Sequence, residues 1–147
     1  MKNKHNLLSV DKLCVDFSAG DTVTHAVKDI SFKIDHGETL ALVGESGSGK
    51  TVSALSILQL LPYPAASHPG GAIYFKGENL LALPPDGLRH VRGNQISMIF
   101  QEPMTSLNPL HTIERQIAEV LSIHEGITGE KARARVLDLL TKVGIQN

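Results

Sequence analysis

The pattern of apolar and polar positions near the start of the chain predicts two antiparallel strands. The two classes alternate with a partial period of two over residues 7–17 and again over residues 23–34. In the second run the inward-facing candidates are Val27, Ile30, Phe32 and Ile34. Such alternation is typical of an antiparallel sheet with one face in water, so we expect an antiparallel β layer over residues 1–38.

The character of the chain changes after residue 38. Residues 39–43 form a short continuous apolar run, which is typical of a strand buried on both faces. From Lys50 to Leu61 apolar residues recur at helical spacing, and Pro62 then stops the helix. A glycine-rich segment joins the two elements. We therefore predict a strand, a loop and a helix in that order, and the strand before Gly44 is part of the prediction.

The middle of the chain is less regular. Residues 62–71 contain three prolines and two glycines and are predicted to form a loop, followed by a strand at 72–75. A short helix is expected between Pro84 and Gly93. A second buried strand is expected at 95–100.

Two amphipathic helices are predicted in the last third of the chain. Thr112 is a suitable N-cap for the first, and Thr128 begins the second. Their apolar stripes are, respectively, Ile113, Ile117, Val120, Leu121 and His124, and Ala132, Val136, Leu139, Leu140 and Val143.

Composition excludes several classes of protein. The net charge of −1 argues against a nucleic-acid-binding surface, because such a surface needs concentrated positive charge. A single cysteine, Cys14, rules out an intrachain disulfide framework, fits a reducing compartment, and is expected to be a buried small hydrophobic residue. No window is apolar enough to be a signal peptide or to cross a bilayer. The seven histidines show no paired spacing for metal ligands.

The segment Gly44-Glu45-Ser46-Gly47-Ser48-Gly49-Lys50-Thr51 fits the Walker A pattern, G-x-x-x-x-G-K-[ST]. Glycines allow the backbone to curl so that the amides of Ser46 through Val52 point inward at an anion, next to the positive end of the following helix. Lys50 would place an ammonium on the β- and γ-phosphates, and the Thr51 hydroxyl would be a Mg²⁺ ligand. The motif therefore predicts binding of a nucleoside triphosphate, ATP.

Two strings of the sequence are characteristic of one family: the run from Gly37 through Thr51, and Ile99-Phe100-Gln101-Glu102-Pro103-Met104-Thr105-Ser106-Leu107-Asn108-Pro109. On these strings the chain resembles the N-terminal part of an ATP-binding-cassette (ABC) ATPase, from about Leu7 to Gly144. The second string is the more discriminating, because ordinary P-loop enzymes have nothing like it. Within the superfamily the chain is most similar to ATPases of oligopeptide and dipeptide importers, especially those of the microcin C and related peptide type.

The resemblance implies roles for further residues. Phe17 stands where the family has an aromatic that stacks on adenine, more often Tyr, with a plain core residue as the alternative. Gln101 matches the Q-loop glutamine, which contacts magnesium and the attacking water. Glu102, Leu107 and Leu110 would lie where the cytoplasmic helices of a transmembrane permease subunit dock.

Three features of the family are not found in the sequence: the Leu-Ser-Gly-Gly-Gln signature, a Walker B strand ending in Asp-Glu, and a switch histidine. The nearest candidate for Walker B, Val136-Leu137-Asp138, falls in an amphipathic helix and is not followed by Glu. We therefore expect a truncated chain that binds ATP weakly and does not hydrolyse it alone. The apolar run before Gly44 would then lack a neighbouring strand.

The sequence thus predicts an α/β fold, an incomplete P-loop NTPase core of the ABC ATPase type. Its expected parts are the β layer (1–38), the P-loop core to the Q-loop (39–101) and the start of a helical subdomain (102–147). The implied function is the ATPase subunit of a peptide importer, peripheral on the cytoplasmic face of the inner membrane. Its partners would be permease subunits, a second ATP-binding cassette (as a homodimer, heterodimer or tandem pair) and, indirectly, a peptide-binding protein, with no nucleic acid. The alternatives are a soluble ABC ATPase outside transport and a non-catalytic nucleotide-binding module.

Overall fold

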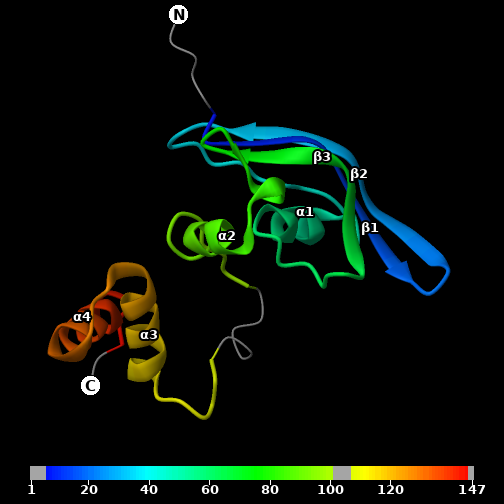
Figure 1. The fold of residues 1–147 in the computed structure, drawn as a ribbon. Helices are drawn as coiled ribbons and strands as arrows, with labels where there is room; N and C mark the ends of the chain where they lie inside the picture. Colours follow the sequence, from blue (N-terminus) through cyan, green and yellow to red (C-terminus); the bar gives the residue numbers. More distant parts are fainter. Residues whose placement is uncertain (1–5, 101–106, 146–147) are drawn as a thin grey trace, which may run out of the picture. The chain divides into compact units, whose positions relative to one another are not determined.

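The computed structural model describes residues 6–100 and 107–145 of the 147-residue chain. These residues fall into two compact units, Met1–Val91 and Arg92–Asn147. The first unit contains a sheet and the helices next to it, and the second contains a helical hairpin (Figure 1).

An antiparallel sheet forms the base of the first unit. Strand β1 (Leu8–Ala19) pairs with β2 (Thr22–Ile34) on one edge and with β3 (Ala66–Phe75) on the other, and β3 continues into β4 (Glu78–Asn79). The order across the sheet is β2-β1-β3-β4. The first two strands confirm the antiparallel layer that the alternating pattern predicts.

The predicted loop at 62–71 is wrong over its second half, because residues 66–71 belong to β3. The prediction fails because of the role of two glycines, Gly70 and Gly71. Gly71 has a φ of +91°, and a side chain there would overlap the backbone of Lys12 in β1, where the register between the strands shifts. Gly70 lies against the side chain of Cys14, which is half-buried rather than buried. Here glycine marks a close approach of two strands at a bulge, and not the end of a strand.

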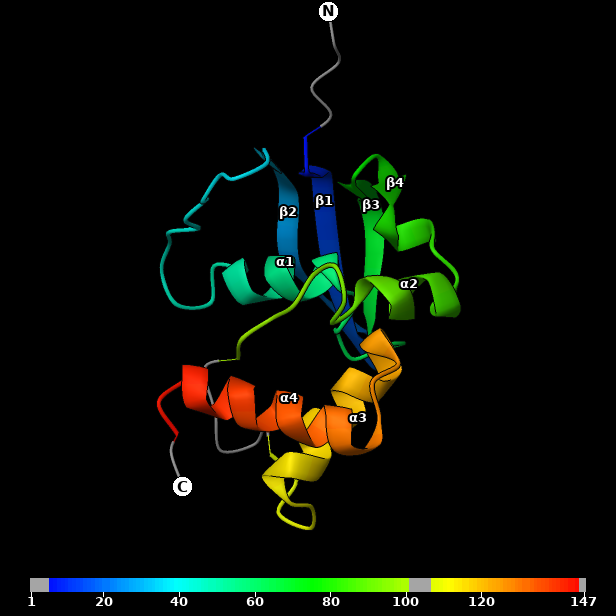
Figure 2. The same cartoon turned by 90° about the vertical axis from the view of Figure 1, so that its left-hand side faces the viewer.

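Helix α1 (Lys50–Ile57) lies along one face of the sheet, where it contacts β1 and β2 (Figure 2). It is shorter than predicted, because the chain leaves the helix at Leu58 and Gln59 takes up a left-handed conformation before Pro62 is reached. The predicted stripe is also shifted. Leu58 and Leu61 are buried, but the fully buried positions within the helix are Ser53 and Ser56.

The two fully buried side chains of α1 are small and polar. Both serine hydroxyls bond to the helix itself: Ser53 Oγ donates to the Gly49 carbonyl at 2.9 Å, and Ser56 Oγ donates to the Val52 carbonyl at 2.8 Å. The buried polar atoms are therefore satisfied.

Two predicted strands are absent from the described residues. Residues 39–43 pair with no other segment there, and Val43 is 91% exposed. Residues 95–100 form only an isolated bridge between Ile96 and Arg92, and Ile99 is 98% exposed. A continuous apolar run indicates a segment suited to burial, but a strand also needs neighbours with which its backbone can pair, and the described chain supplies none.

The segments after β4 complete the first unit. The 3-10 turn at Leu80–Ala82 and helix α2 (Pro85–Val91) follow β4, and α2 confirms the short helix predicted there. The fully buried apolar side chains of this unit are Val10, Leu13, Val15, Ile73 and Leu80. All but Leu80 lie on the sheet strands, so the sheet supplies most of the core against which α1 packs.

We expect His68 of β3 to make the stability of the first unit dependent on pH. Burial lowers the pKa of His68 below its usual value of 6.5, because the charged imidazolium is poorly solvated there. At pH values between the lowered pKa of the folded state and the usual value, the unfolded chain therefore binds more protons at His68 than the folded chain does. We expect the free energy of unfolding to be constant above the unfolded pKa and to fall as the pH drops through 6.5.

Urea unfolding at a series of pH values measures this effect. In the His68→Gln variant the loss of stability in that window should be reduced. An equal loss in the variant and the wild type would show that another group is responsible.

The second unit is a hairpin of two helices, α3 (Ile113–Glu125) and α4 (Gly129–Lys142). Thr112 caps α3 as predicted, since its hydroxyl accepts from the Arg115 amide at 3.2 Å. Thr128 occupies the corresponding position of α4, but its side chain makes no capping bond. The buried centre consists of Leu121, Ala132 and Val136, with Ile117, Ala118, Ile127, Leu139 and Leu140 packed around it.

The predicted stripes therefore face each other through Ile117, Leu121, Ala132, Val136, Leu139 and Leu140. The prediction is wrong for Ile113, Val120 and Val143, whose side chains are exposed. No helix in residues 6–100 and 107–145 is long and apolar enough to cross a membrane.

Candidate functional site

The glycine-rich segment before α1 is curled around the ammonium of its own lysine. Lys50 Nζ donates to the carbonyls of Gly44 at 2.8 Å and Glu45 at 2.6 Å, and to Ser48 Oγ at 3.2 Å. The Ser48 amide closes the turn by donating to the Glu45 carbonyl at 3.2 Å. The positive charge is thus held at the centre of the loop.

The end of the loop is fixed by contact with β2. Gly49 is the N-cap of α1, is buried and has a φ of +87°. A β-carbon on Gly49 would lie 2.7 Å from the Ala26 carbonyl oxygen and 3.1 Å from Val27 Cγ2. Only glycine fits at this position, for steric as well as conformational reasons. The motif predicts a glycine here, but nothing in the motif identifies β2 as the surface against which it packs.

Two other glycines of the loop have different requirements. Gly47 has a φ of +79°, and a β-carbon there would meet no atom of the described residues within 4 Å, so only its backbone conformation favours glycine. At Gly44 a β-carbon would lie 2.7 Å from Ser48 Oγ, so a side chain there would require the Ser48 hydroxyl to turn away.

A small hollow of about 140 Å³ opens where the loop meets the helix. Its lining consists of Ala26, Gly47, Ser48, Gly49, Lys50, Thr51 and Val52. The helix begins at Lys50, so the amides of its first residues have no acceptor within the helix. These amides, the helix dipole and the Lys50 ammonium together favour an anion, and the residues present fit a chain of phosphates.

Of the amides predicted to face the anion, that of Ser48 is engaged in the turn with Glu45. Ala26 was not predicted as a lining residue. Its place in the hollow depends on the pairing of β2 with β1, which no local motif encodes.

The residues predicted to complete the site are distributed along the chain. The Thr51 side chain is exposed at the start of α1, beside the hollow. Phe17 is half-buried in β1, between Thr24 of β2 and Ala66 of β3. Gln101 and Glu102 lie outside the described residues. No group of three His, Cys, Asp or Glu side chains in the described chain is placed to hold a metal ion.

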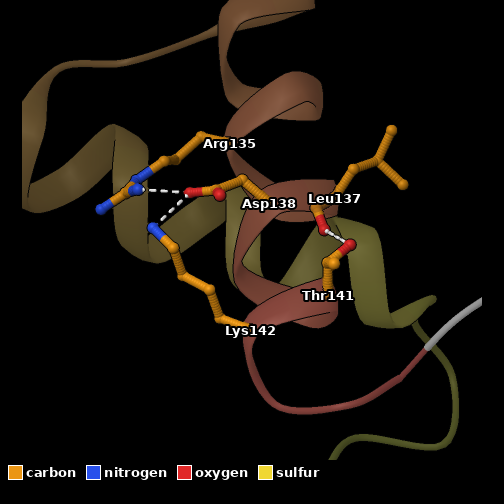
Figure 3. A network of polar contacts seen from close by, with 5 residues as sticks. All are labelled: Arg135, Leu137, Asp138, Thr141 and Lys142. Atoms are coloured by element: carbon orange, nitrogen blue, oxygen red, sulfur yellow. Dashed lines mark hydrogen bonds and ion pairs between the residues drawn. The ribbon is translucent and has the colours of Figure 1, made fainter.

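Asp138, the acidic residue of the Walker B-like triplet, lies on the surface of α4 (Figure 3). Its carboxylate accepts from Arg135 Nη1 at 2.7 Å and from Lys142 Nζ at 2.8 Å. The bond from Lys142 is the main cause that lowers the pKa of Asp138, followed by the charge of Lys142 and the bond from Arg135. This carboxylate belongs to a pair network on a helix surface, in agreement with the sequence-based interpretation.

The helical unit has a larger hollow of about 830 Å³, lined in part by Leu107, Gln116, Val120 and Leu139. Gln116 fixes the segment that leads into α3. Its Oε1 accepts from the Asn108 amide at 2.9 Å, and its Nε2 donates to the carbonyls of Asn108 and His111, both at 3.0 Å. Leu107 and Leu110 are exposed beside this segment, as predicted, with Leu110 86% exposed.

Comparison with known proteins supports the phosphate-binding interpretation. A peptidoglycan transport ATP-binding protein of Agrobacterium fabrum is 62% identical over 144 residues, which cover 98% of this chain and 26% of that protein. An oligopeptide transport ATP-binding protein of Bacillus subtilis is 45% identical over 139 residues, which cover 95% of this chain and 39% of that protein. The chain therefore spans between about a quarter and two fifths of the length of these curated relatives.

Solved structures give the same picture of the fold. A dimeric ATP-binding cassette in a post-hydrolysis state, bound to ADP and Pi, superposes with a TM-score of 0.79 at 25% identity. The match covers 95% of this chain and 58% of that one, which confirms an incomplete ABC ATPase fold. The ABC transporter family model matches residues 27–147. The chain therefore belongs to the ABC transporter family, as part of its ATP-binding domain.

Proposed function

We propose that the chain binds Mg²⁺ and ATP at the loop of residues 44–51, as part of a subunit that powers import of peptides or peptide-like compounds. The observation that carries the proposal is the hollow between the loop and α1, with free helix amides and the Lys50 ammonium at its wall. The names of the relatives, which refer to peptidoglycan and oligopeptide transport, support the class of cargo.

Different residues would bind the phosphates, the magnesium ion and the adenine. The amides of Gly47, Gly49 and the first turn of α1 would bind the phosphate oxygens, and Lys50 would neutralise their charge. The Thr51 hydroxyl and the amide of Gln101 would be ligands of Mg²⁺. The ion supplies electrostatic stabilisation of the phosphates when bound. Phe17 would stack on the adenine.

Hydrolysis and transport are proposed for the whole protein. The exposed apolar segment 39–43 is suited to pair with further strands in the complete domain, and that domain would supply the residues that activate water. The dimeric state of the superposed cassette supports a second cassette as partner.

The exposed Leu107 and Leu110, on a segment fixed by Gln116, support docking of a transmembrane permease on the helical unit. A peptide-binding protein would act through that permease. These contacts would place the subunit on the cytoplasmic face of the inner membrane. A soluble ABC ATPase and a non-catalytic nucleotide-binding module are the alternative functions.

Replacement of Thr51 by alanine tests the proposed magnesium site. The Thr51 side chain is exposed at the hollow rather than packed beneath α1, so the fold should be retained. We expect nucleotide binding to persist but to weaken about tenfold, and to lose most of its dependence on Mg²⁺, because one of the two proposed protein ligands of the ion is lost. Isothermal calorimetry with ATP in the presence of Mg²⁺ or EDTA measures both effects.

Thr39→Ala is the matched control, since Thr39 lies before the loop and outside the hollow. It should leave the magnesium dependence unchanged. An unaltered magnesium response in Thr51→Ala would remove Thr51 from the site. No binding of ATP by the wild type would refute the proposed function.

A further inference from the structure

The pairing of β1 with β2 is interrupted beside the phosphate loop. Val15 pairs with Val27, but the next residue of β1, Asp16, pairs with His25. One residue of β2, Ala26, is therefore extra and forms a bulge. Bulges redirect the backbone, and this one turns the Ala26 carbonyl toward Gly49, where it fills the space of a side chain.

A pair of side chains links the two strands next to the bulge. His25 Nδ1 lies 2.7 Å from Asp16 Oδ1, across the two strands at the first rung after Ala26. The Asp16 side chain is only 15% exposed, while that of His25 is 60% exposed. The pair therefore bridges the strands at the point where the backbone ladder is irregular, and it constrains the residue between His25 and Val27.

We propose that the Asp16–His25 pair is a positioning device for the phosphate loop, acting through the Ala26 bulge on Gly49. The proposal rests on the proposed function, since the loop matters only if it binds phosphates. The chain of contacts is short: Asp16 holds His25, His25 fixes the adjoining Ala26, and Ala26 abuts Gly49. Gly49 begins α1 and lines the hollow, so a shift of the bulge moves the amides that face the phosphates.

A double-mutant cycle on the whole chain tests the device. Asp16→Ala and His25→Ala should each weaken the affinity for Mg-ATP about threefold, the size expected of a partly exposed pair. The double variant should also lose about threefold, because the two side chains act as one unit. Asp16→Asn keeps an oxygen acceptor for His25 and should retain most of the affinity. Asp86→Ala, which breaks the Asp86–Arg89 pair on α2, is the control and should have no effect.

A second measurement needs no nucleotide. In the ¹⁵N-labelled chain the Gly49 amide resonance should move in Asp16→Ala and His25→Ala, while that of the distant Gly77 should not. If the pair only stabilised the fold, its removal would lower the resistance of the protein to urea. The Gly49 resonance and the affinity of the folded protein for Mg-ATP would then be unchanged.

These experiments distinguish a failure of the proposed function from a failure of the positioning proposal. If the wild type does not bind Mg-ATP, the proposed function fails. If it binds and the two single variants bind equally well, or if the Gly49 resonance does not move, the positioning proposal is overturned. A loss of affinity in His25→Ala alone would also overturn it, because it would assign His25 a direct contact with the nucleotide.

Discussion

Lys50→Ala should lower the affinity of the chain for Mg-ATP by at least about a hundredfold. The ammonium is the one side-chain charge among the described residues in the wall of the hollow, and two charge-assisted hydrogen bonds to phosphate account for a loss of this size. The same substitution removes the three bonds that Lys50 Nζ makes to the loop, so the loop would also lose its curl. Isothermal calorimetry measures the change.

Two controls separate charge from shape. Lys131→Ala removes the same charge from the exposed surface of α4 and should leave the affinity unchanged. Lys50→Arg retains the charge but not the compact ammonium, and should recover only part of the binding. Equal affinity in Lys50→Ala and the wild type would place the nucleotide elsewhere.

Gly49→Ala should destabilise the first unit by about 3 kcal/mol and abolish nucleotide binding. A left-handed conformation costs a residue with a side chain about 1–2 kcal/mol, and overpacking against β2 costs about 1–3 kcal/mol more. The new methyl group would meet the Ala26 carbonyl oxygen, a backbone atom that cannot turn away as a side chain can and that moves only with the bulge of β2. Urea unfolding gives the free energy, and calorimetry gives the affinity.

Gly47→Ala is the matched control for this substitution. Gly47 has a similar φ of +79°, but a methyl group there meets no atom of the described residues within 4 Å. Its cost should be about 1 kcal/mol, from backbone conformation alone. If the two variants were equally stable, the contact between Gly49 and β2 would not hold the loop in place.

The sequence predicts the elements whose determinants are local. The alternation in β1 and β2, the capping of α3 by Thr112 and the apolar stripes of the helical hairpin all depend on neighbours within a few residues. The phosphate loop is also a local motif. Its residue types follow from the charge of the ligand, and its curl around Lys50 is present in the structure.

The errors arise where structure depends on distant segments. Residues 39–43 have the composition of a buried strand but no pairing partner in the described chain, and the apolar run at 95–100 makes only the bridge between Ile96 and Arg92. The phosphate loop nevertheless forms without a paired strand before Gly44. It is held by Lys50 and by the contact of Gly49 with β2, so the predicted strand is not a requirement for the loop.

Pairing between strands also explains the features that sequence reasoning missed. Gly70 and Gly71 read as a loop because their role, a close approach to β1, depends on which strand lies beside them. Ala26 has no distinctive chemistry, and it reaches the hollow only because the register of β2 shifts by one residue. Neither relation has a signal in the local pattern.

Titration of the ¹⁵N-labelled chain with Mg-ATP, followed by amide resonances, tests the central claim most directly. If the loop binds the phosphates, the largest changes will occur at the amides of Gly47, Gly49, Lys50, Thr51 and Val52, and AMP will cause much smaller ones. If these amides stay in place while resonances of α3 and α4 shift, or if no resonance shifts, the loop is not a phosphate site.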